Sequence, residues 1–339
     1  MDGQKIKRTK PEWMEIISRY NKPDPLKSWW QIINSVGSYL ILWVIMVKSL
    51  EISYLLTLGL SVLAAGFLVR IFIIFHDCGH GSFFRSKRMN TVVGIITGLF
   101  VFTPYHRWHR DHHIHHQTVG NLDKRGTGDV MTLTVDEYHK LSGWRRFGYR
   151  LYRNPVFLFG ISPILLFVVL YRFTKKYMSW RERIYVYLTN LALAGVITLV
   201  ILAIGWKAYL FIQLPVLYIA TVHGVWLFYV QHQFRHVLWT DSGNWDYMTV
   251  ALKGSSLFKL PALLNWFTGN IGYHHIHHLS PAIPNYNLKK CHHENSIFRQ
   301  VKPITFMSAF ESLLLRLWDE KRGMLITFRE RRNAKAEAV

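Results

Sequence analysis

Hydrophobic residues in this chain are gathered into long blocks that alternate with polar, basic stretches. Three blocks run 22 or 23 residues with Arg70 as their only charge, and they are Ser53–Phe75, Ile184–Gly205 and Ala208–Val230. A fourth block, Ile32–Val47, is shorter and uncharged. About 20 apolar residues in a helix cross the hydrocarbon of a bilayer. The pattern therefore predicts four membrane-spanning helices.

The four blocks pair naturally into two hairpins, and two further apolar stretches remain. Thr91–Thr103 is too short to span alone, and Val156–Tyr171 is interrupted by Pro163 and flanked by arginines. We expect both to be helices that lie in the membrane interface or dip back. The predicted fold class is an all-α integral membrane protein with four spanning helices in two hairpins, interfacial or re-entrant helices, and a cytoplasmic cap.

The distribution of charge predicts the orientation. The chain is half hydrophobic, yet its formal net charge is +21, a balance that in a soluble protein often indicates nucleic acid. The two hairpin tips, however, hold only Lys48 and Lys207 of the 41 Lys and Arg residues. The positive-inside rule then places both tips outside and the termini in the cytoplasm. We interpret the excess charge as orientation and contact with anionic lipid, and expect no nucleic-acid partner.

Histidine is the most informative residue type in the polar stretches. The pentapeptide His-His-Ile-His-His occurs twice, at His112–His116 and at His274–His278, and a shorter cluster, His76–His80, directly follows the second apolar block. Neutral imidazole is the commonest protein ligand for transition metals near pH 7. Because all three clusters fall on the predicted cytoplasmic side, the spacing predicts a metal centre there.

Helical geometry shows which histidines can act together. His76 and His80 are four residues apart and share a helix face. In the second cluster His112 and His116 can be joined by either His113 or His115, and the same ambiguity separates His275 from His277 in the third. His232, which follows the last apolar block, is a further candidate, with an interfacial residue as its alternative interpretation.

Eight or nine convergent histidines exceed one zinc site, which normally takes three or four protein ligands. They fit two metal ions with several imidazoles each, and ligand type alone leaves iron, copper and zinc open. Neither the Glu-x-x-His pattern of carboxylate di-iron bundles nor His-Glu-x-x-His occurs in the chain. Cys78, inside the first cluster, is interpreted as a small packing residue, and both cysteines, Cys78 and Cys291, as reduced thiols.

Other polar residues near the clusters have weaker signals. We expect His139, His292 and His293 to be solvated, and His223, which lies within an apolar block, to bond a backbone carbonyl. His106 and His109 are candidates for supporting the ligands. Three further residues could orient ligand imidazoles, although each also has a purely structural interpretation: Asp77, Asp111 and Asn270.

The three clusters resemble the histidine boxes of the membrane fatty-acid desaturases, which have the forms H-x3-H, H-x2-H-H and H-x2-H-H in this order. Neighbouring residues agree as well, and they read HDCGHGSFF from His76, NLDKRGTGD from Asn121 and GNIGYHHIHHLSPAIPNY from Gly269. The likeness extends from about Ile32 to Phe328. The chain looks most like the acyl-lipid desaturases of bacilli, of which the best known type is a Δ5 desaturase.

The resemblance implies a choice among the histidines and a cofactor. It makes His115 and His277 ligands and His113 and His275 their neighbours, and it implies two iron ions, molecular oxygen and two electrons. The nine implied metal-binding and catalytic residues are His76, His80, His112, His115, His116, His232, His274, His277 and His278.

The implied reaction is the oxygen-dependent introduction of a cis double bond into saturated acyl chains of membrane phospholipids, of the Δ5 type. An unactivated methylene offers no acidic proton to acid–base side chains, so a metal cofactor must carry the oxidation. The chain has no haem domain, four-Cys cluster motif or Rossmann fingerprint, and the resemblance implies an external ferredoxin or flavodoxin as electron donor. The implied location is the cell membrane.

Two other functions are consistent with parts of the pattern. A related di-iron membrane hydroxylase would use similar boxes, and a metal transporter or metal-buffering membrane protein would also gather histidines. Transporters place ionisable ligands near the bilayer midplane, whereas the blocks here hold only His223 and Arg70. By domain, we expect a cytoplasmic segment over 1–31, one membrane desaturase domain over 32–330, and a disordered basic tail over 331–339.

Overall fold

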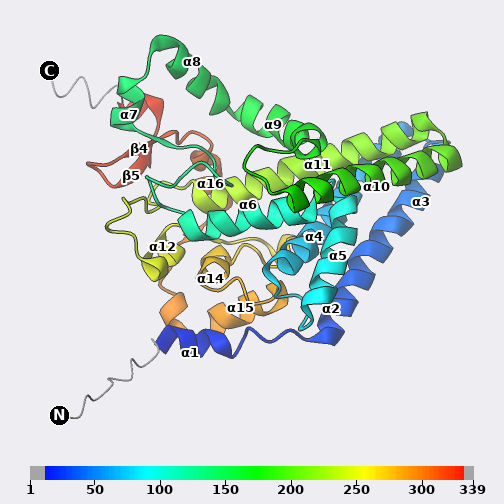
Figure 1. Cartoon of the computed structure of the whole chain (residues 1–339), viewed down its shortest axis with the longest axis horizontal. Helices are drawn as coiled ribbons and strands as arrows, with labels where there is room; N and C mark the ends of the chain where they lie inside the picture. The colour runs from blue at the N-terminus through cyan, green and yellow to red at the C-terminus, as the bar shows by residue number, and fades with distance from the viewer. Residues whose placement is uncertain (1–11, 332–339) are drawn as a thin grey trace.

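Four long apolar helices run side by side through one half of the molecule (Figure 1). The computed structural model describes residues 12–331, so the start of the predicted N-terminal segment and nearly all of the predicted tail lie outside the described residues. The helices long and apolar enough to span a membrane are Pro25–Ser49, which comprises α2 (Pro25–Ile32), η1 (Ile33–Gly37) and α3 (Ser38–Ser49), together with α4 (Tyr54–His80), α10 (Trp180–Ile204) and α11 (Trp206–His232). The prediction of four spanning helices is confirmed.

The ends of the helices differ from the apolar blocks in a way that matters for function. The first span begins at Pro25, because the side chain of Asp24 accepts hydrogen bonds from the backbone N–H groups of Leu26 and Lys27 and caps the helix. Helices α4 and α11, which pack against each other, continue past the blocks to His80 and His232. The first histidine cluster therefore forms the last turn of a spanning helix instead of following it.

The two shorter apolar stretches do not form straight spans among the described residues. Helix α5 (Lys87–Phe100) has 14 residues, or about 21 Å, and packs along α4 before the chain turns into α6 (Tyr105–Thr118). After α8 (Gly143–Tyr152) the chain bends by 54° into a broken helical stretch. That stretch consists of η2 (Val156–Ile161), α9 (Ser162–Ile164), η3 (Leu165–Val169) and η4 (Leu170–Arg172).

The other half of the molecule is a cap of short elements, with α12, α14 and α15 below α6 and α7, β4 and β5 to its upper left (Figure 1). Its helices are α1 (Glu12–Ser18), α7 (Val135–Lys140), α12 (Tyr247–Lys253), α13 (Ala262–Phe267), α14 (His274–Leu279), α15 (Asn285–Glu294), η5 (Ser296–Phe298) and α16 (Phe306–Ser312). Short strands also occur, which the all-α prediction did not include. They form one sheet in the order β1 (Leu133–Thr134), β4 (Leu317–Asp319) and β5 (Met324–Ile326), and a pair β2 (Leu257–Phe258) and β3 (Pro303–Ile304).

A buried arginine fastens the cap to the end of α11. The side chain of Arg153 is fully buried and donates to Gln233 Oε1 (2.8 Å) and to the backbone oxygens of Met131 (3.0 Å) and Leu315 (3.1 Å). Its guanidinium also lies over the ring of Tyr229. Since these groups come from three separate segments, Arg153 fixes the strand before α7, the chain before β4 and the end of α11 relative to one another.

We predict that Arg153→Met destabilises the folded protein by about 3 kcal/mol, because it leaves several buried acceptors without a donor. Thermal unfolding of the purified full chain in detergent measures this change. Arg85→Met is the matched control, since Arg85 is exposed and should leave the unfolding temperature nearly unchanged. Equal unfolding temperatures for the two variants would contradict the role given to Arg153.

Candidate metal centre

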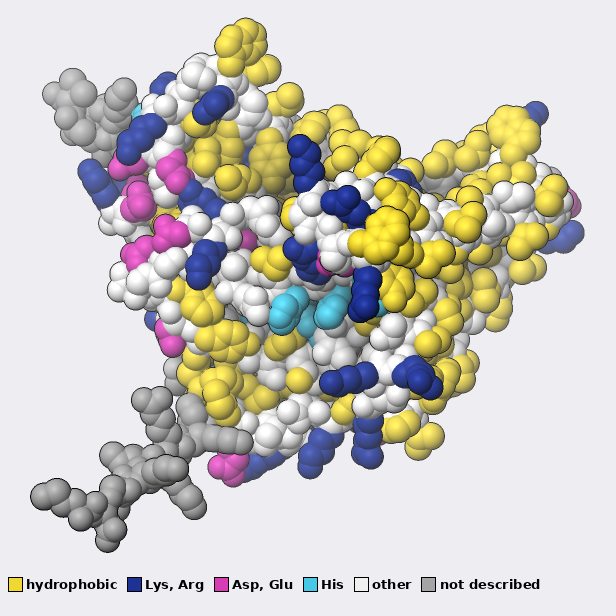
Figure 2. Space-filling view, viewed as in Figure 1, with side chains coloured by type: hydrophobic (Ala, Val, Ile, Leu, Met, Phe, Trp, Pro, Cys, Tyr) yellow, Lys and Arg dark blue, Asp and Glu magenta, His cyan; other side chains and the backbone are white. Residues whose placement is uncertain are grey.

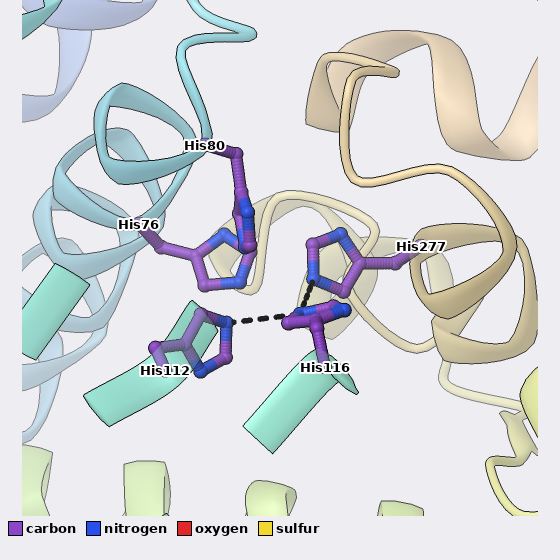
Figure 3. Close-up of side chains that lie close together, drawn as sticks. All are labelled: His76, His80, His112, His116 and His277. Atoms are coloured by element: carbon purple, nitrogen blue, oxygen red, sulfur yellow. Dashed lines mark hydrogen bonds between the residues drawn. The ribbon is translucent and has the colours of Figure 1, made fainter. Parts of the chain in front are cut away.

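Five histidines from three helices point their rings into one space (Figure 3). His76 and His80 come from the last turns of α4, His112 and His116 from α6, and His277 from α14. Their donor nitrogens all lie within 4.8 Å of one another. We call these five residues group A.

Four more histidines form a second space beside the first. His115 comes from α6, His232 from the end of α11, and His274 and His278 from α14. Their donor nitrogens also lie within 4.8 Å of one another. These four residues are group B.

The two groups share walls, because neighbouring residues of one helix belong to different groups. On α6, His112 and His116 face group A and His115 faces group B, and on α14, His277 faces group A. The rings of His116 and His278, one from each group, stack with centroids 4.2 Å apart. Two ions bound here would therefore be close neighbours.

Contacts between ring nitrogens test whether a metal ion fits. In group A, Nε2 of His116 lies 3.2 Å from Nε2 of His112 and 3.0 Å from Nε2 of His277 (dashed lines in Figure 3). A single proton can bridge only one of these pairs, so lone pairs would otherwise face each other. Two nitrogens bound at right angles to a metal about 2.1 Å away would lie about 3 Å apart, as these do. The donor set fits a metal cation.

Group B has the same character. Nε2 of His232 lies 3.2 Å from Nε2 of His115 and 2.9 Å from Nε2 of His274, and Nε2 of His278 lies 3.1 Å from that of His274. In group A, Nε2 of His80 is buried without a hydrogen-bond partner among the described residues. Both groups thus hold nitrogens that a cation would satisfy.

Burial keeps these imidazoles neutral, which is the form that binds metal. It lowers the pKa of His112, His116 and His277 well below the ordinary value of 6.5, and neighbouring histidines lower it further. Burial has the same effect on the pKa of His274 and His278. At neutral pH the rings therefore offer lone pairs instead of positive charges.

One carboxylate supports each group. Oδ1 of Asp77 lies 3.0 Å from Nδ1 of His76, and Oδ1 of Asp129 lies 2.5 Å from Nδ1 of His115. A carboxylate at Nδ1 holds the proton there and directs the Nε2 lone pair to the metal. The backbone oxygen of Gly254, 3.2 Å from Nδ1 of His232, does the same for a third ring.

Asp129 is the supporting residue that the sequence reasoning did not single out, although it ends the NLDKRGTGD segment. It is positioned by Gly128, whose φ of 73° lies in the left-handed region. A Cβ at this position would lie 2.9 Å from the backbone oxygen of Asp111 and 3.0 Å from Cβ of His115. The sequence signal that could have indicated Asp129 is a glycine directly before an acid, shortly after the His112–His116 cluster.

Comparison with known proteins identifies the family of this arrangement. The family model described as "Fatty acid desaturase" matches residues 52–303. This chain belongs to the fatty acid desaturase family. It is 45% identical to a protein named "Fatty acid desaturase" of Bacillus subtilis (strain 168), over 97% of this chain and 94% of that protein. It is accordingly an oxidoreductase.

More distant relatives of this desaturase carry more specific names. It is 29% identical to the "sn-1 acyl-lipid omega-3 desaturase (ferredoxin)" of a Synechocystis strain, over 65% of this chain and 62% of that protein. It is 25% identical to the "sn-1 oleoyl-lipid 12-desaturase" of a Picosynechococcus strain, over 79% of this chain and 76% of that one. The first of these two relatives is thus matched over less than two thirds of its length.

The histidines that geometry alone left ambiguous lie as follows in this desaturase. His115 and His277 point into the groups, whereas His113 is exposed, with Nε2 3.0 Å from Nε2 of Gln117. Nε2 of His275 lies 3.1 Å from Nδ1 of His292. The prediction that His292 is solvated is wrong, because α15 packs against α14 and buries this ring.

Other predicted neighbours lie away from the two groups. Asp111 accepts a hydrogen bond from Tyr177 and lies near Lys175 instead of a histidine, and the side-chain amide of Asn270 donates to the backbone oxygen of Asn285. His223 is exposed on α11 with its ring against Trp226, and it has no carbonyl partner among the described residues.

Cys78 is buried, and it belongs to neither histidine group.

We predict that Asp129→Asn weakens metal retention by about 10- to 100-fold, because the amide no longer fixes the proton of His115 as a carboxylate does. The measurement is the metal content per chain after dialysis against increasing concentrations of a chelator. Asp136→Asn is the control, since Asp136 is exposed on α7. Retention by Asp129→Asn equal to that of the control would exclude this role.

Proposed function

We propose that this desaturase holds one iron ion in group A and one in group B, and that it uses oxygen to introduce a cis double bond into acyl chains of membrane phospholipids. The convergence of nine ring nitrogens in two adjoining groups carries the proposal. Bound iron would supply the oxidation of an unactivated methylene, which acid–base side chains cannot perform.

The chain's own residues bind and orient the cofactor. In this proposal the nine histidines are its ligands, and Asp77 and Asp129 hold the Nδ1 protons of His76 and His115 so that Nε2 faces inward. All nitrogens come from helices and not from loops, which limits how far the ligands can shift during the reaction.

Aromatic side chains exclude water on the membrane side of the groups. Trp108 stacks on His112 with centroids 4.3 Å apart, and Phe75 packs against Trp108 at 4.8 Å. Phe228 of α11 covers His115 at 5.1 Å. An acyl chain that reaches the groups from the membrane would meet this apolar wall, which favours a hydrocarbon substrate over a polar one.

The names of relatives support a lipid-linked acyl chain as the substrate, since two of them are termed acyl-lipid or oleoyl-lipid desaturases. We propose that the double bond is introduced at Δ5, because the sequence motifs resemble those of the acyl-lipid desaturases of bacilli, whose best known type is a Δ5 desaturase. The two more distant relatives are named for other positions, and the name of the Bacillus subtilis relative gives none, so the position of the bond in this protein is the property to be measured.

The proposed orientation puts both histidine groups in the cytoplasmic half of a cell-membrane protein. Lys48 and Lys207 are the basic residues at the ends of the spanning helices remote from the histidines. Among the described residues, the other Lys and Arg residues apart from Arg70 lie near or beyond the opposite ends of these helices, and by the positive-inside rule we take that side as cytoplasmic.

We predict that expression of the wild-type chain in a bacterium with few unsaturated lipids produces a new double bond in its phospholipids, at Δ5. His277→Ala should abolish the product, because it removes a group A nitrogen, whereas His113→Ala should retain most of it. Mass analysis of the fatty acids, with and without oxygen, measures the outcome. A hydroxylated chain, or a product made without oxygen, would contradict the proposal.

The electron donor is proposed to be a small acidic protein such as a ferredoxin or flavodoxin. One relative is named for ferredoxin. Figure 2 shows histidine side chains at the surface with Lys and Arg side chains on either side of them. His109 and His113 are exposed on α6, beside the partly buried His80 and His112 of group A. Three exposed basic residues, Arg85, Lys87 and Arg88, follow α4 in the chain. Exposed Lys175 lies 3.8 Å from Asp111 of α6, and exposed Lys176 is next to it.

We predict that turnover at limiting concentrations of an acidic ferredoxin falls on the order of threefold or more as salt rises from 50 to 200 mM, because salt screens attraction between the two surfaces. Lys87→Glu should lower the rate at low salt more than Lys321→Glu, an exposed residue near β5. A rate independent of salt, with the two variants alike, would contradict electrostatic docking at this face.

A further inference from the structure

Helix α8 is amphipathic, and its apolar side is exposed. Trp144, Phe147 and Leu151 are spaced three and four residues apart and so form one stripe, with exposed fractions of 84%, 59% and 51%. Basic residues occupy the flanks of the stripe. Figure 2 shows hydrophobic side chains projecting from this edge of the molecule with Lys and Arg side chains beside them. A helix with such a stripe is typical of one that lies in the plane of a membrane surface.

The apolar stripe is continuous with the surface that would face the membrane. Three residues separate α8 from the broken stretch, which exposes Val156 (73%) and Ile161 (50%). Its elements η2 and α9 pack against the spanning helix α11. The axis of α8 is bent by 54° from that of the broken stretch. If the broken stretch dips into the leaflet, α8 therefore lies along the leaflet surface.

An open apolar groove of about 390 Å³ lies along the inner side of α8. Its walls are fixed, because Tyr152 OH accepts from the backbone N–H of Met131 (3.1 Å) and Tyr149 OH accepts from that of Leu133 (3.1 Å). Met131 and Leu133, on the opposite wall, closely follow Asp129 in the chain, and Asp129 supports group B. The groove is lined by Met131, Leu133, Leu141, Arg145, Gly148, Tyr149 and Tyr152.

Arg145 is the cation of this groove whose guanidinium remains available. The guanidinium of Arg146 donates to the backbone oxygens of Leu141 (2.9 Å) and His139 (2.7 Å), and that of Arg150 donates to Tyr138 OH (2.7 Å). Arg145, in contrast, is exposed and has no hydrogen-bond or ion-pair partner among the described residues. A free guanidinium beside an apolar groove matches a phosphate diester that carries acyl chains.

We propose that α8 docks the cap on the anionic surface of the cytoplasmic leaflet, and that the groove beneath it binds one phospholipid, with the phosphate on Arg145 and acyl carbons against Tyr149 and Tyr152. The stripe lies among the lipids, so the open groove faces the headgroup layer. The identification of this bound lipid as the acyl substrate rests on the proposed function. Lipid binding itself requires no turnover.

The full chain in uncharged detergent, titrated with fluorescently labelled phosphatidylglycerol, tests the groove. Gly148→Leu should lower affinity about tenfold or more, because a side chain at this position enters the groove, and a Cβ there meets no atom of the protein within 4 Å. Gly143→Leu is the matched control, since a Cβ there is equally free and Gly143 does not line the groove. Both changes replace a helical glycine and should not lower the unfolding temperature.

Arg145→Gln tests the charge in the same titration. It should weaken binding about tenfold, as loss of a charge-assisted hydrogen bond does, while Arg181→Gln, which removes another exposed arginine, should not. Hydrogen exchange adds a measurement that needs no variant. Amides of residues 143–152 should be more protected in nanodiscs with phosphatidylglycerol than in detergent.

Unchanged affinity in both Gly148→Leu and Arg145→Gln, or exchange that is the same in nanodiscs and detergent, overturns the inference. Loss of affinity in Gly143→Leu and Arg181→Gln to the same degree also overturns it, because binding would then be unspecific. A protein that binds lipid through this groove but forms no double bond would instead refute the proposed function alone, so the two failures are distinguishable.

Discussion

Nine imidazole rings turn their nitrogens toward one another in a space from which most water is excluded. Neutral rings packed this way repel through their lone pairs, and protonated rings would repel through their charges while also losing hydration. A cation in each group removes both problems at once. The contacts of His116 Nε2 with two other ring nitrogens, 3.0 and 3.2 Å away, show the constraint most directly. The arrangement of the helices keeps these ring nitrogens close together.

That arrangement depends on two spanning helices that continue beyond the apolar blocks. Because α4 and α11 reach His80 and His232 without a break, the bundle and the metal ligands belong to the same rigid elements. Helix α6, which packs against α4 and α10, supplies ligands to both groups, and α14 closes the site from the cap. Arg153 and the two supporting carboxylates hold the cap segments in place around it. A shift of the bundle would thus be transmitted to the ligands directly.

Much of this was predictable from the sequence, for identifiable physical reasons. Spanning helices follow from long uncharged blocks, and histidine clusters from their spacing. The choice of His115 over His113 was not decided by helical geometry, because both lie on the same side as His112, and the outcome depends on where α11 and α14 approach α6. Asp129 was missed because it lies 14 residues from the ring that it supports, and their contact depends on the turn at Gly128. His292 was misjudged because charge in its neighbourhood says nothing about the packing of α15 on α14.

In the proposed function, each of the two histidine groups holds one iron ion. Anomalous diffraction from crystals of the purified full chain, recorded on both sides of the iron absorption edge, tests it most directly. We expect two iron peaks per chain, one among the nitrogens of group A and one among those of group B. A single peak, a peak outside both groups, or scattering that identifies zinc instead of iron would contradict it.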